Sequence, residues 1–319
     1  MSAQEKKPFD VIGLGCTAVD DLLYVPRFPA ADEKTRVEKT ARRFGGLTGA
    51  ALAAGARAGA RCAYAGCLGT DEFSDYVAQC LAKEGIDISH VPRPPQGAVV
   101  HSVIVVGKDT GSRTIFFEGR GAIGAHDTRP SDDVLRGCRV LFIDHWGMAG
   151  NLRAARLARS AGVAVVADLE DSGSPLFPEL LHLVDHLILS EKFALALTGA
   201  KDAAAAAQAL WHEERAAVIV TCGARGCWSV SAETGLASVH HRAFVVRAAD
   251  TTGCGDIFHG AYAARLARGD ALKERIRFAS AAAALKARQA DIPFLSEIQD
   301  FLQAHPAERG NSLKRRHRP

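Results

Sequence analysis

The chain has 319 residues, and its 39 lysines and arginines nearly balance its 36 aspartates and glutamates, which leaves a net charge of +3. Part of this excess lies in a basic run at residues 314–318, so the rest of the chain carries no broad positive field for nucleic acid or for a membrane surface. We expect this basic tail, residues 305–319, to be disordered. The length suits one large α/β domain with a small appendage as well as it suits two domains.

The eight cysteines are scattered and include no Cys-x-x-Cys pair, so neither a disulfide framework nor a zinc site is predicted. They are Cys16, Cys62, Cys67, Cys80, Cys138, Cys222, Cys227 and Cys254. The first ten residues are polar with no apolar region behind them, and no apolar stretch reaches the ~18 residues that a membrane-spanning helix needs. We therefore expect a cytoplasmic protein that binds neither nucleic acid nor membrane.

Short apolar runs alternate with helical patterns along most of the chain. We expect strands at 9–15, 61–67, 140–143, 163–167, 186–189 and 217–221. We expect helices at 70–84, 151–161, 191–197, 202–214, 255–268 and 272–288, the first of them with Thr70 or Asp71 as its N-cap. This alternation predicts a mainly parallel sheet that is covered by helices on both faces.

Two segments interrupt the alternation, at about 17–44 and 96–120. The first has strand-like stretches at 22–25 and 35–39 around Pro26 and Pro29, and no helical pattern. The second resembles a β-hairpin, with stretches 98–106 and 113–118 on either side of a turn region. We expect the two to pair into a small sheet that forms a lid over the C-terminal edge of the main sheet, where ligands of open α/β folds bind.

The sharpest motif is the heptapeptide DTTGCGD at residues 250–256, which precedes an apolar helix. Gly253 and Gly255 would let the backbone approach a ligand closely, and the free N–H groups and dipole of a helix N-terminus favour an anion. Asp256, in the first turn, could take a proton from an attacking hydroxyl group. An anion site beside a base suits phosphoryl transfer, although a Gly-x-Gly-Asp motif alone is also typical of an ordinary helix start.

The whole heptapeptide, with Phe258 and the pair Gly260-Ala261, resembles the C-terminal signature of the ribokinase-like (PfkB) carbohydrate kinases. An upstream set follows the N-terminal signature of the same family: Gly45, Gly46, Ala51, Ala54, Gly59, Gly66, Gly69, Asp71, Leu81, Gly85, Ile86 and Asp87. The resemblance covers about residues 9–304 and implies one kinase domain over that range. It also implies a three-layer αβα ribokinase-like core with a β-sheet lid, and the use of ATP with Mg²⁺.

The resemblance also implies roles for single residues on the nucleotide side. Asp256 would be the catalytic base, and the backbone N–H groups of Gly253, Cys254 and Gly255 would hold the transferring phosphate. The loop at 221–226 resembles the nucleotide loop of the family. The implied ATP contacts are Thr221, Gly223, Gly226, Thr252 and Ser190.

On the sugar side, Asp20 stands at the sugar-binding aspartate position of the family. The resemblance implies that Gly45 and Gly46 also bind the sugar substrate. Asp32 lies in a stretch that resembles ketohexokinases, and Lys34 matches a lid lysine of sulfofructose kinases that bind an anionic sugar. Their spacing of two would place both side chains on one face of a lid strand. A solvated lysine that protects an edge strand is the other interpretation of Lys34.

Three departures from the family pattern bear on function. Ala50 replaces an asparagine that many members use on the sugar. The family's Asn-x-x-Glu motif, tied to the metal, reads Ser190-Glu191-Lys192-Phe193 here. Glu191 and Glu170 are two candidates to replace the missing glutamate through water, and the sequence does not choose between them. Residues 287–291 lack the glycines of the family's potassium loop, which leaves potassium activation open.

We therefore expect an ATP-dependent sugar kinase that acts on a ketose or a substituted ketose, with a homodimer formed through the lid. A nucleoside kinase and a non-catalytic sugar-binding relative are the alternatives. A dinucleotide-binding oxidoreductase is suggested only by the glycines at 13 and 15 and the alanine at 18. That fingerprint needs a helix next, and Pro26 and Pro29 rule one out.

Overall fold

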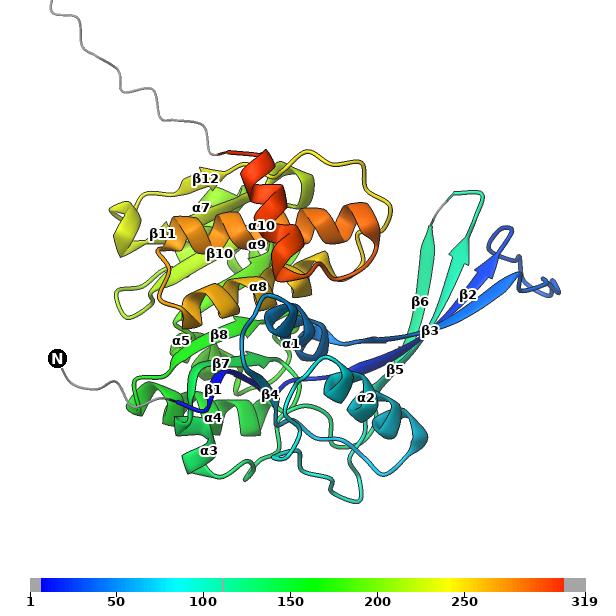
Figure 1. Ribbon diagram of the computed structural model, residues 1–319, viewed down its shortest axis with the longest axis horizontal. Helices are drawn as coiled ribbons and strands as arrows, with labels where there is room; N and C mark the ends of the chain where they lie inside the picture. The colour runs from blue at the N-terminus through cyan, green and yellow to red at the C-terminus, as the bar shows by residue number, and fades with distance from the viewer. Residues whose placement is uncertain (1–6, 111, 307–319) are drawn as a thin grey trace, which may run out of the picture.

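The main sheet places the candidate motifs at one edge of an α/β core. The structure is a computed structural model and describes residues 7–110 and 112–306 (Figure 1). The main sheet has eight strands in the order β12-β11-β10-β9-β8-β7-β1-β4. Six of them are parallel: β4 (Cys62–Tyr64), β1 (Phe9–Gly13), β7 (Cys138–Asp144), β8 (Ala164–Asp168), β9 (His186–Ser190) and β10 (Ala217–Thr221). The edge strands β11 (Cys227–Ser231) and β12 (Val239–His241) are antiparallel. All six strands expected from the sequence are present.

Helices cover both faces of this sheet, which confirms the three-layer arrangement. Successive strand residues such as Val11 and Ile12 belong to two different buried clusters, because side chains alternate across a strand. On one face lie α1 (Leu47–Arg57), α2 (Glu72–Lys83), α8 (Cys254–Ala267), α9 (Leu272–Gln289) and α10 (Leu295–Ala304). On the other lie α3 (Asp132–Arg136), α4 (Met148–Ser160), α5 (Phe177–Leu183), α6 (Glu191–Thr198) and α7 (Ala203–Leu210).

The expected helices form, with some differences at their ends. Asp71 is the N-cap of α2, and its carboxylate accepts hydrogen bonds from the backbone N–H groups of Phe73 and Ser74. Helix α7 ends at Leu210, short of the expected boundary at 214. Helix α1 was not predicted, because its alanines and glycines are buried on nearly every side and show no contrast of polar and apolar faces.

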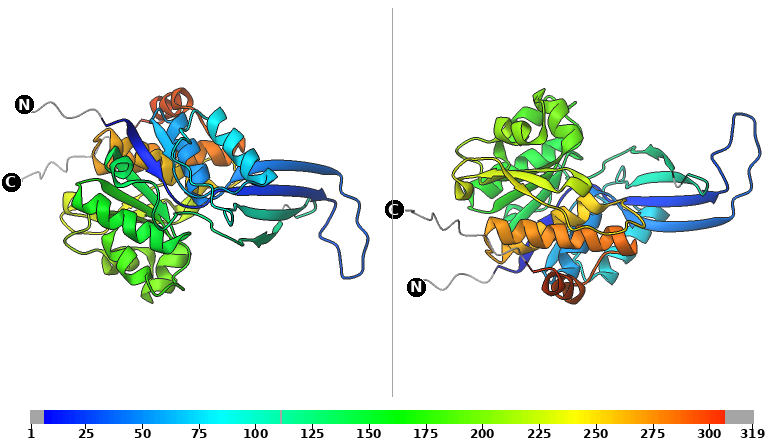
Figure 2. Two further views of the ribbon diagram at one scale, coloured as in Figure 1. Left: turned by 90° about the horizontal axis from the view of Figure 1, so that it is seen from below. Right: turned by 90° about the horizontal axis from the view of Figure 1, so that it is seen from above.

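The two insertions pair into one four-stranded lid sheet, as expected. Its order is β3-β2-β5-β6, built from β2 (Ala18–Val25), β3 (Lys39–Gly45), β5 (Val100–Gly107) and β6 (Arg113–Glu118). Figures 1 and 2 show this sheet projecting from one side of the core. The chain enters β2 directly after the carboxyl end of β1, so the lid stands at the expected edge of the main sheet.

The strand expected at 35–39 is wrong except at Lys39. Strand β2 ends at Val25, and its register places Lys39 opposite Tyr24. Glu38 still donates a hydrogen bond to the carbonyl oxygen of Tyr24, but residues 35–37 have no strand opposite them. Asp32 lies in a turn with φ 61, and Asp32 and Lys34 are both exposed in the β2–β3 loop. The predicted shared face of a lid strand therefore does not exist for these two residues.

The base of the lid is tightly packed against the core. Gly46, the N-cap of α1, has φ 87, and a Cβ atom there would lie 2.6 Å from the Cα atom of Thr17. Glycine is therefore required where β3 leads into α1 beside the start of β2. No helix within the described residues has the length and apolar character that a membrane crossing requires. Residues 307–319, with nearly all of the expected basic tail, lie outside the described residues.

Candidate active site

The N-terminus of α8 faces an open cavity. Gly253 is its N-cap, with φ 73, a left-handed conformation that favours glycine. The first N–H groups of a helix have no partner within it, and they carry the positive end of its dipole. A Cβ atom built on Gly255 would meet no protein atom within 4 Å, and Gly255 lines the cavity. The local geometry therefore leaves room for an anion at this helix end.

The cavity has a volume of about 370 Å³ and brings together several of the predicted nucleotide-binding residues. Thr221, Gly223 and Gly226 lie on one side of it, and Cys254 and Gly255 on another. The rest of its wall is mostly apolar and includes Ala243, Phe244, Val245, Val246, Phe258 and Ala284. An apolar pocket that ends at a helix N-terminus suits a ligand with a flat apolar part and an anionic part.

Two residues predicted to contact ATP have structural partners instead. The backbone N–H and the hydroxyl group of Thr252 donate to the Asp250 carboxylate at 2.9 and 2.7 Å. Ser190 is the N-cap of α6 and accepts a 3.3 Å hydrogen bond from the N–H of Phe193. Neither residue is among the described residues that line the cavity.

Asp256 lies in the first turn of α8 among other carboxylates. Its side chain is only partly exposed, and burial raises its pKa well above the usual aspartate value. The negative charges of Asp168, Glu170, Asp144 and Asp20 raise that pKa further. A carboxylate whose pKa is raised is a stronger base once it has lost its proton, as a proton acceptor requires.

The sequence did not mark Asp144 and Asp168 as part of the site. They are the last residues of the neighbouring parallel strands β7 and β8, and they stand opposite each other in the register. A polar residue at the carboxyl end of an apolar strand was the available signal. Burial raises the pKa of Asp168 to about 6, although the nearby His259 acts to lower it.

His259 holds the start of α8 against the sheet. Its Nδ1 atom lies 2.7 Å from the carbonyl oxygen of Gly255 and 3.3 Å from Oδ2 of Asp168, and its Nε2 atom lies 3.0 Å from the carbonyl oxygen of Ile188. These contacts tie the first turn of α8 to the carboxyl end of β8 and to β9.

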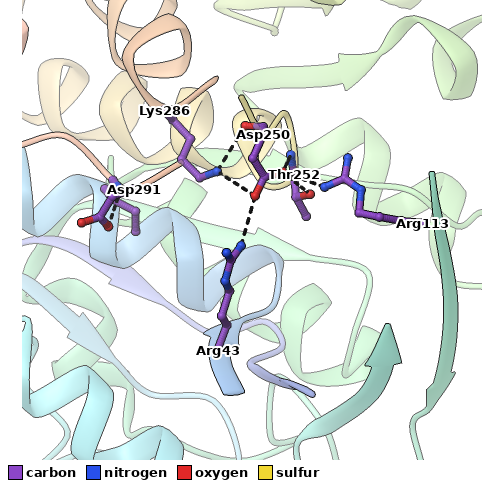
Figure 3. Close-up of polar contacts among 7 residues, drawn as sticks. Arg43, Arg113, Asp250, Thr252, Lys286 and Asp291 are labelled. Carbon is purple, nitrogen blue, oxygen red and sulfur yellow. Dashed lines mark hydrogen bonds and ion pairs between the residues drawn. The ribbon is translucent and has the colours of Figure 1, made fainter. Parts of the chain in front are cut away.

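Asp250 joins the lid to the glycine-rich loop, a connection that the sequence did not reveal (Figure 3). Its carboxylate accepts from Arg43 of β3 at 3.0 Å and from Arg113 of β6 at 2.6 Å. Burial acts to raise the pKa of Asp250, but hydrogen bonds from Thr252 and Arg43 and the charge of Lys286 outweigh it and lower the pKa to about 2. The carboxylate is therefore charged throughout the physiological pH range.

The residues predicted for the sugar divide into two groups. A Cβ atom on Gly45 would lie 2.9 Å from Oδ2 of Asp20, so Asp20 lies directly against the end of β3. Burial raises the pKa of Asp20, and its charge in turn raises the pKa of Asp256. Asp32 and Lys34 do not join them, because the β2–β3 loop lies at the far end of the lid from α8 (Figure 1).

The two glutamates considered for the metal have different surroundings. Glu191 forms an ion pair with Arg225, which compensates its charge. Glu170 is exposed and follows β8, and its charge raises the pKa of Asp256. No group of three or more histidine, cysteine or acidic residues within the described ranges could hold a metal ion by itself. The residues present therefore fit an ion that arrives with a phosphate ligand better than they fit a permanent metal site.

Comparison with known proteins agrees with this geometry. Residues 10–292 match the model of the pfkB family carbohydrate kinases. A ribokinase of Haemophilus influenzae is 29% identical over 301 residues, covering 91% of this chain and 97% of the relative. A ketohexokinase of Mus musculus is 24% identical over 285 residues, covering 84% and 92%. The structure of Arabidopsis thaliana ribokinase complexed with ribose and ATP superposes with a TM-score of 0.80 at 23% identity, covering 92% of this chain and 99% of that one.

The family model spans most of the chain, and the fold and the relatives agree with it. The chain therefore belongs to the pfkB family of carbohydrate kinases, and the expectation of an ATP-dependent sugar kinase is confirmed at that level.

Proposed function

We propose that this protein transfers the terminal phosphoryl group of ATP to a hydroxyl group of a ketose or a substituted ketose. The observation that carries the proposal is the surroundings of Asp256. It follows Gly255, which lines the cavity, and it is near enough to Asp20 at the base of the lid for the charge of Asp20 to raise its pKa. The nucleotide would occupy the cavity, and the sugar would bind between Asp20 and Asp256.

Each residue then has a definite task. The backbone N–H groups at Gly253, Cys254 and Gly255 stabilise the charge on the transferring phosphoryl group, for which the N–H of Cys254 exchanges its 3.3 Å hydrogen bond to the carbonyl oxygen of Thr251. Asp256 accepts the proton of the attacking hydroxyl group. Asp20 accepts hydrogen bonds from sugar hydroxyl groups, with Gly45 leaving room beside it, whereas Gly46 is packed against the backbone of Thr17. Mg²⁺ would arrive with ATP and neutralise phosphate charge, and Glu170 is the better candidate to reach it through water because Glu191 is already paired with Arg225.

The choice of sugar rests on two kinds of support. The ketose is favoured by the likeness of the stretch around Asp32 to ketohexokinases and by the ketohexokinase relative. The ribokinase relative, at the higher identity, supports ribose as the competing acceptor. Because Asp32 and Lys34 lie away from Asp256, our proposed sugar site leaves them out. The intact glycine-rich loop and Asp256 favour an enzyme over a non-catalytic sugar-binding protein.

We also propose a homodimer that forms through the lid. Strand β6 is an edge strand, and all six of its residues are exposed. Ile115, Phe116 and Phe117 are 53%, 56% and 67% exposed. An exposed apolar edge strand is prone to pair with another chain, and a second copy of the same lid offers a matching surface.

The acceptor can be identified with a panel of fructose, an anionic 6-substituted fructose, ribose and adenosine. We expect the highest kcat/KM for a ketose, and no turnover of any acceptor in excess chelator. Asp20→Ala should lower kcat/KM for every sugar by about 10- to 100-fold, the range for losing hydrogen bonds to a charged group. Lys34→Ala is the matched lid control and should change little. A tenfold preference for adenosine would refute the ketose proposal, and the absence of ADP release with every acceptor would favour a non-catalytic protein.

Asp256→Asn tests the base. The amide keeps the shape of the carboxylate but cannot take the proton, so kcat should fall at least ~10²-fold. The affinity for ATP, measured by calorimetry, should be retained. The exposed Asp75→Asn change is the control and should leave kcat unaltered. Near-normal turnover of Asp256→Asn would show that another group accepts the proton.

Gly255→Val tests the anion site. The added side chain would enter the cavity and not the protein interior, because no protein atom lies within 4 Å of a Cβ atom there. We expect kcat/KM to fall at least ~10²-fold, as for loss of an oxyanion donor, with an unchanged melting temperature. Gly173→Val, in an exposed loop, is the control. A fully active Gly255→Val enzyme would place the phosphate elsewhere.

The lid dimer is tested by sedimentation. Ile115 and Phe117 lie on the same face of β6 because they are two residues apart. The double change to lysine should convert a micromolar-range dimer into a monomer. Leu236→Lys, which alters an exposed apolar residue outside the lid, should leave the dimer intact. A monomeric wild-type protein at tens of micromolar concentration would contradict the proposal.

A further inference from the structure

Lys286 is a buried cation behind the glycine-rich loop. It lies in the last turn of α9 and is 7% exposed. Lysine is rarely buried to this extent unless its charge has a partner. Its Nζ atom lies 3.5 Å from the carbonyl oxygen of Asp250 and 3.9 Å from Oδ2 of the same residue (Figure 3). Both contacts are to the first residue of the loop that leads to the anion site.

The same turn of α9 binds the loop through its backbone. The N–H groups of Ala249 and Asp250 both donate to the carbonyl oxygen of Ala287, at 2.7 and 3.1 Å. Two consecutive residues of α9 therefore hold Asp250. Ala287 accepts from the N–H group of Asp250, and Lys286 lies beside the carbonyl and carboxylate oxygens of Asp250. The position of this helix end determines where the loop starts.

The acidic residue nearest in sequence does not compensate Lys286. Asp291 is turned toward α1, where Arg57 lies 3.2 Å from its carboxylate, and it accepts a 2.7 Å hydrogen bond from the N–H of Ile292 (Figure 3). Among the described residues, Asp250 is the acidic group in contact with Lys286. That carboxylate also accepts from Arg43 and Arg113, so three cations share the single negative charge of Asp250.

The charge of Lys286 reaches the anion site without entering the cavity. The described cavity wall includes Ala283, Ala284 and Ala287 of α9 but not Lys286. Burial raises the pKa of the Cys254 thiol, and the charge of Lys286 acts in the opposite direction. The ammonium group is thus positioned to stabilise negative charge near Cys254 from behind the loop.

We propose that Lys286 is a built-in monovalent cation that fixes the glycine-rich loop and adds positive charge behind the transferring phosphate. Turnover then needs no added monovalent ion, and the potassium activation left open by the sequence is not expected. Lys286 is a positioning residue, since it acts through the loop and does not touch the reactants. The inference rests on the kinase activity but not on which sugar is the acceptor.

Arg43 and Arg113 do not fill this role. They reach Asp250 from the lid, and their side chains are 43% and 32% exposed. Their contribution depends on where the lid stands, whereas Lys286 comes from a core helix. Lys286 is therefore the cation whose position does not depend on the lid.

The experiment compares four proteins in chloride salts of potassium, sodium, ammonium and tetramethylammonium at equal ionic strength, each with its best sugar acceptor. Wild-type kcat should agree within about twofold in all four salts. Lys286→Ala removes the ammonium group and leaves space; its kcat in tetramethylammonium should fall about 10- to 100-fold, the range for losing a charged hydrogen-bonding group. Ammonium or potassium should then restore it at least fivefold, with saturation.

Two further variants make the result specific. Lys286→Met fills the space without the charge, so it should show the same loss and no rescue by any cation. Lys273→Ala changes an exposed lysine of the same helix and should behave as wild type in every salt. Rescue by a small cation is a readout that a merely structural role of Lys286 would not produce.

Three outcomes would overturn the inference. The first is several-fold activation of the wild type by potassium or ammonium over tetramethylammonium, which needs no variant to observe. The second is wild-type turnover by Lys286→Met, and the third is a folded Lys286→Ala that no cation restores. Failure of the ketose proposal would show separately, as a different preferred acceptor of the wild type.

Discussion

The Asp250 carboxylate is the point on which the arrangement of lid, core and glycine-rich loop depends. It binds Arg43 and Arg113 from two lid strands, Thr252 from its own loop, and lies beside Lys286 of α9. Because the group is only 16% exposed, water does not readily replace these partners. Its removal would leave partly buried cations without an anion, which costs far more than an exposed ion pair contributes. The position of the lid is therefore linked physically to the shape of the anion site.

A second constraint operates at the start of α8. The helix end attracts anions, yet Asp256 stands there beside Asp168, Asp144, Asp20 and Glu170. The pKa of the Asp168 carboxyl group is raised to about 6 in the folded protein. Folding therefore disfavours the ionised form of this group. Stability is lost as the pH rises from the ordinary aspartate value toward 6, and it is not regained above that value. His259 and the helix dipole offset part of this cost, which suggests that the acidic cluster is retained for its chemistry and not for stability.

The sequence predicted what local pattern controls. Alternating apolar runs gave the parallel strands, and Asp71 gave the start of α2. The glycine-rich loop was found because its residues are contiguous. The pairing of the two insertions could be predicted because both lacked a helical pattern and needed strand partners.

The sequence could not predict what depends on long-range contacts. Arg43 and Asp250 are 207 positions apart. The residues that flank Arg43 and Arg113 in the sequence do not distinguish these two arginines from arginines that are simply exposed to solvent. Asp32 and Lys34 have the spacing of strand neighbours, but the end of β2 leaves their segment without a partner strand. Thr252 and Ser190 were predicted to contact ATP from their positions in motifs. In the structure, Thr252 is bonded to Asp250, and Ser190 accepts a hydrogen bond from the N–H of Phe193.

The glycines of the family signatures show why a motif alone does not identify a site. Gly46 and Gly226 are required by the fold, since a Cβ atom at Gly226 would lie 1.9 Å from the carbonyl oxygen of His241. Gly260 is likewise required where α8 crosses α1, because a Cβ atom there would lie 1.9 Å from the carbonyl oxygen of Ala51. Gly255 is different, because its backbone is helical and no protein atom would oppose a side chain. The fold does not explain glycine at this position, which agrees with our proposal that a ligand approaches the backbone there.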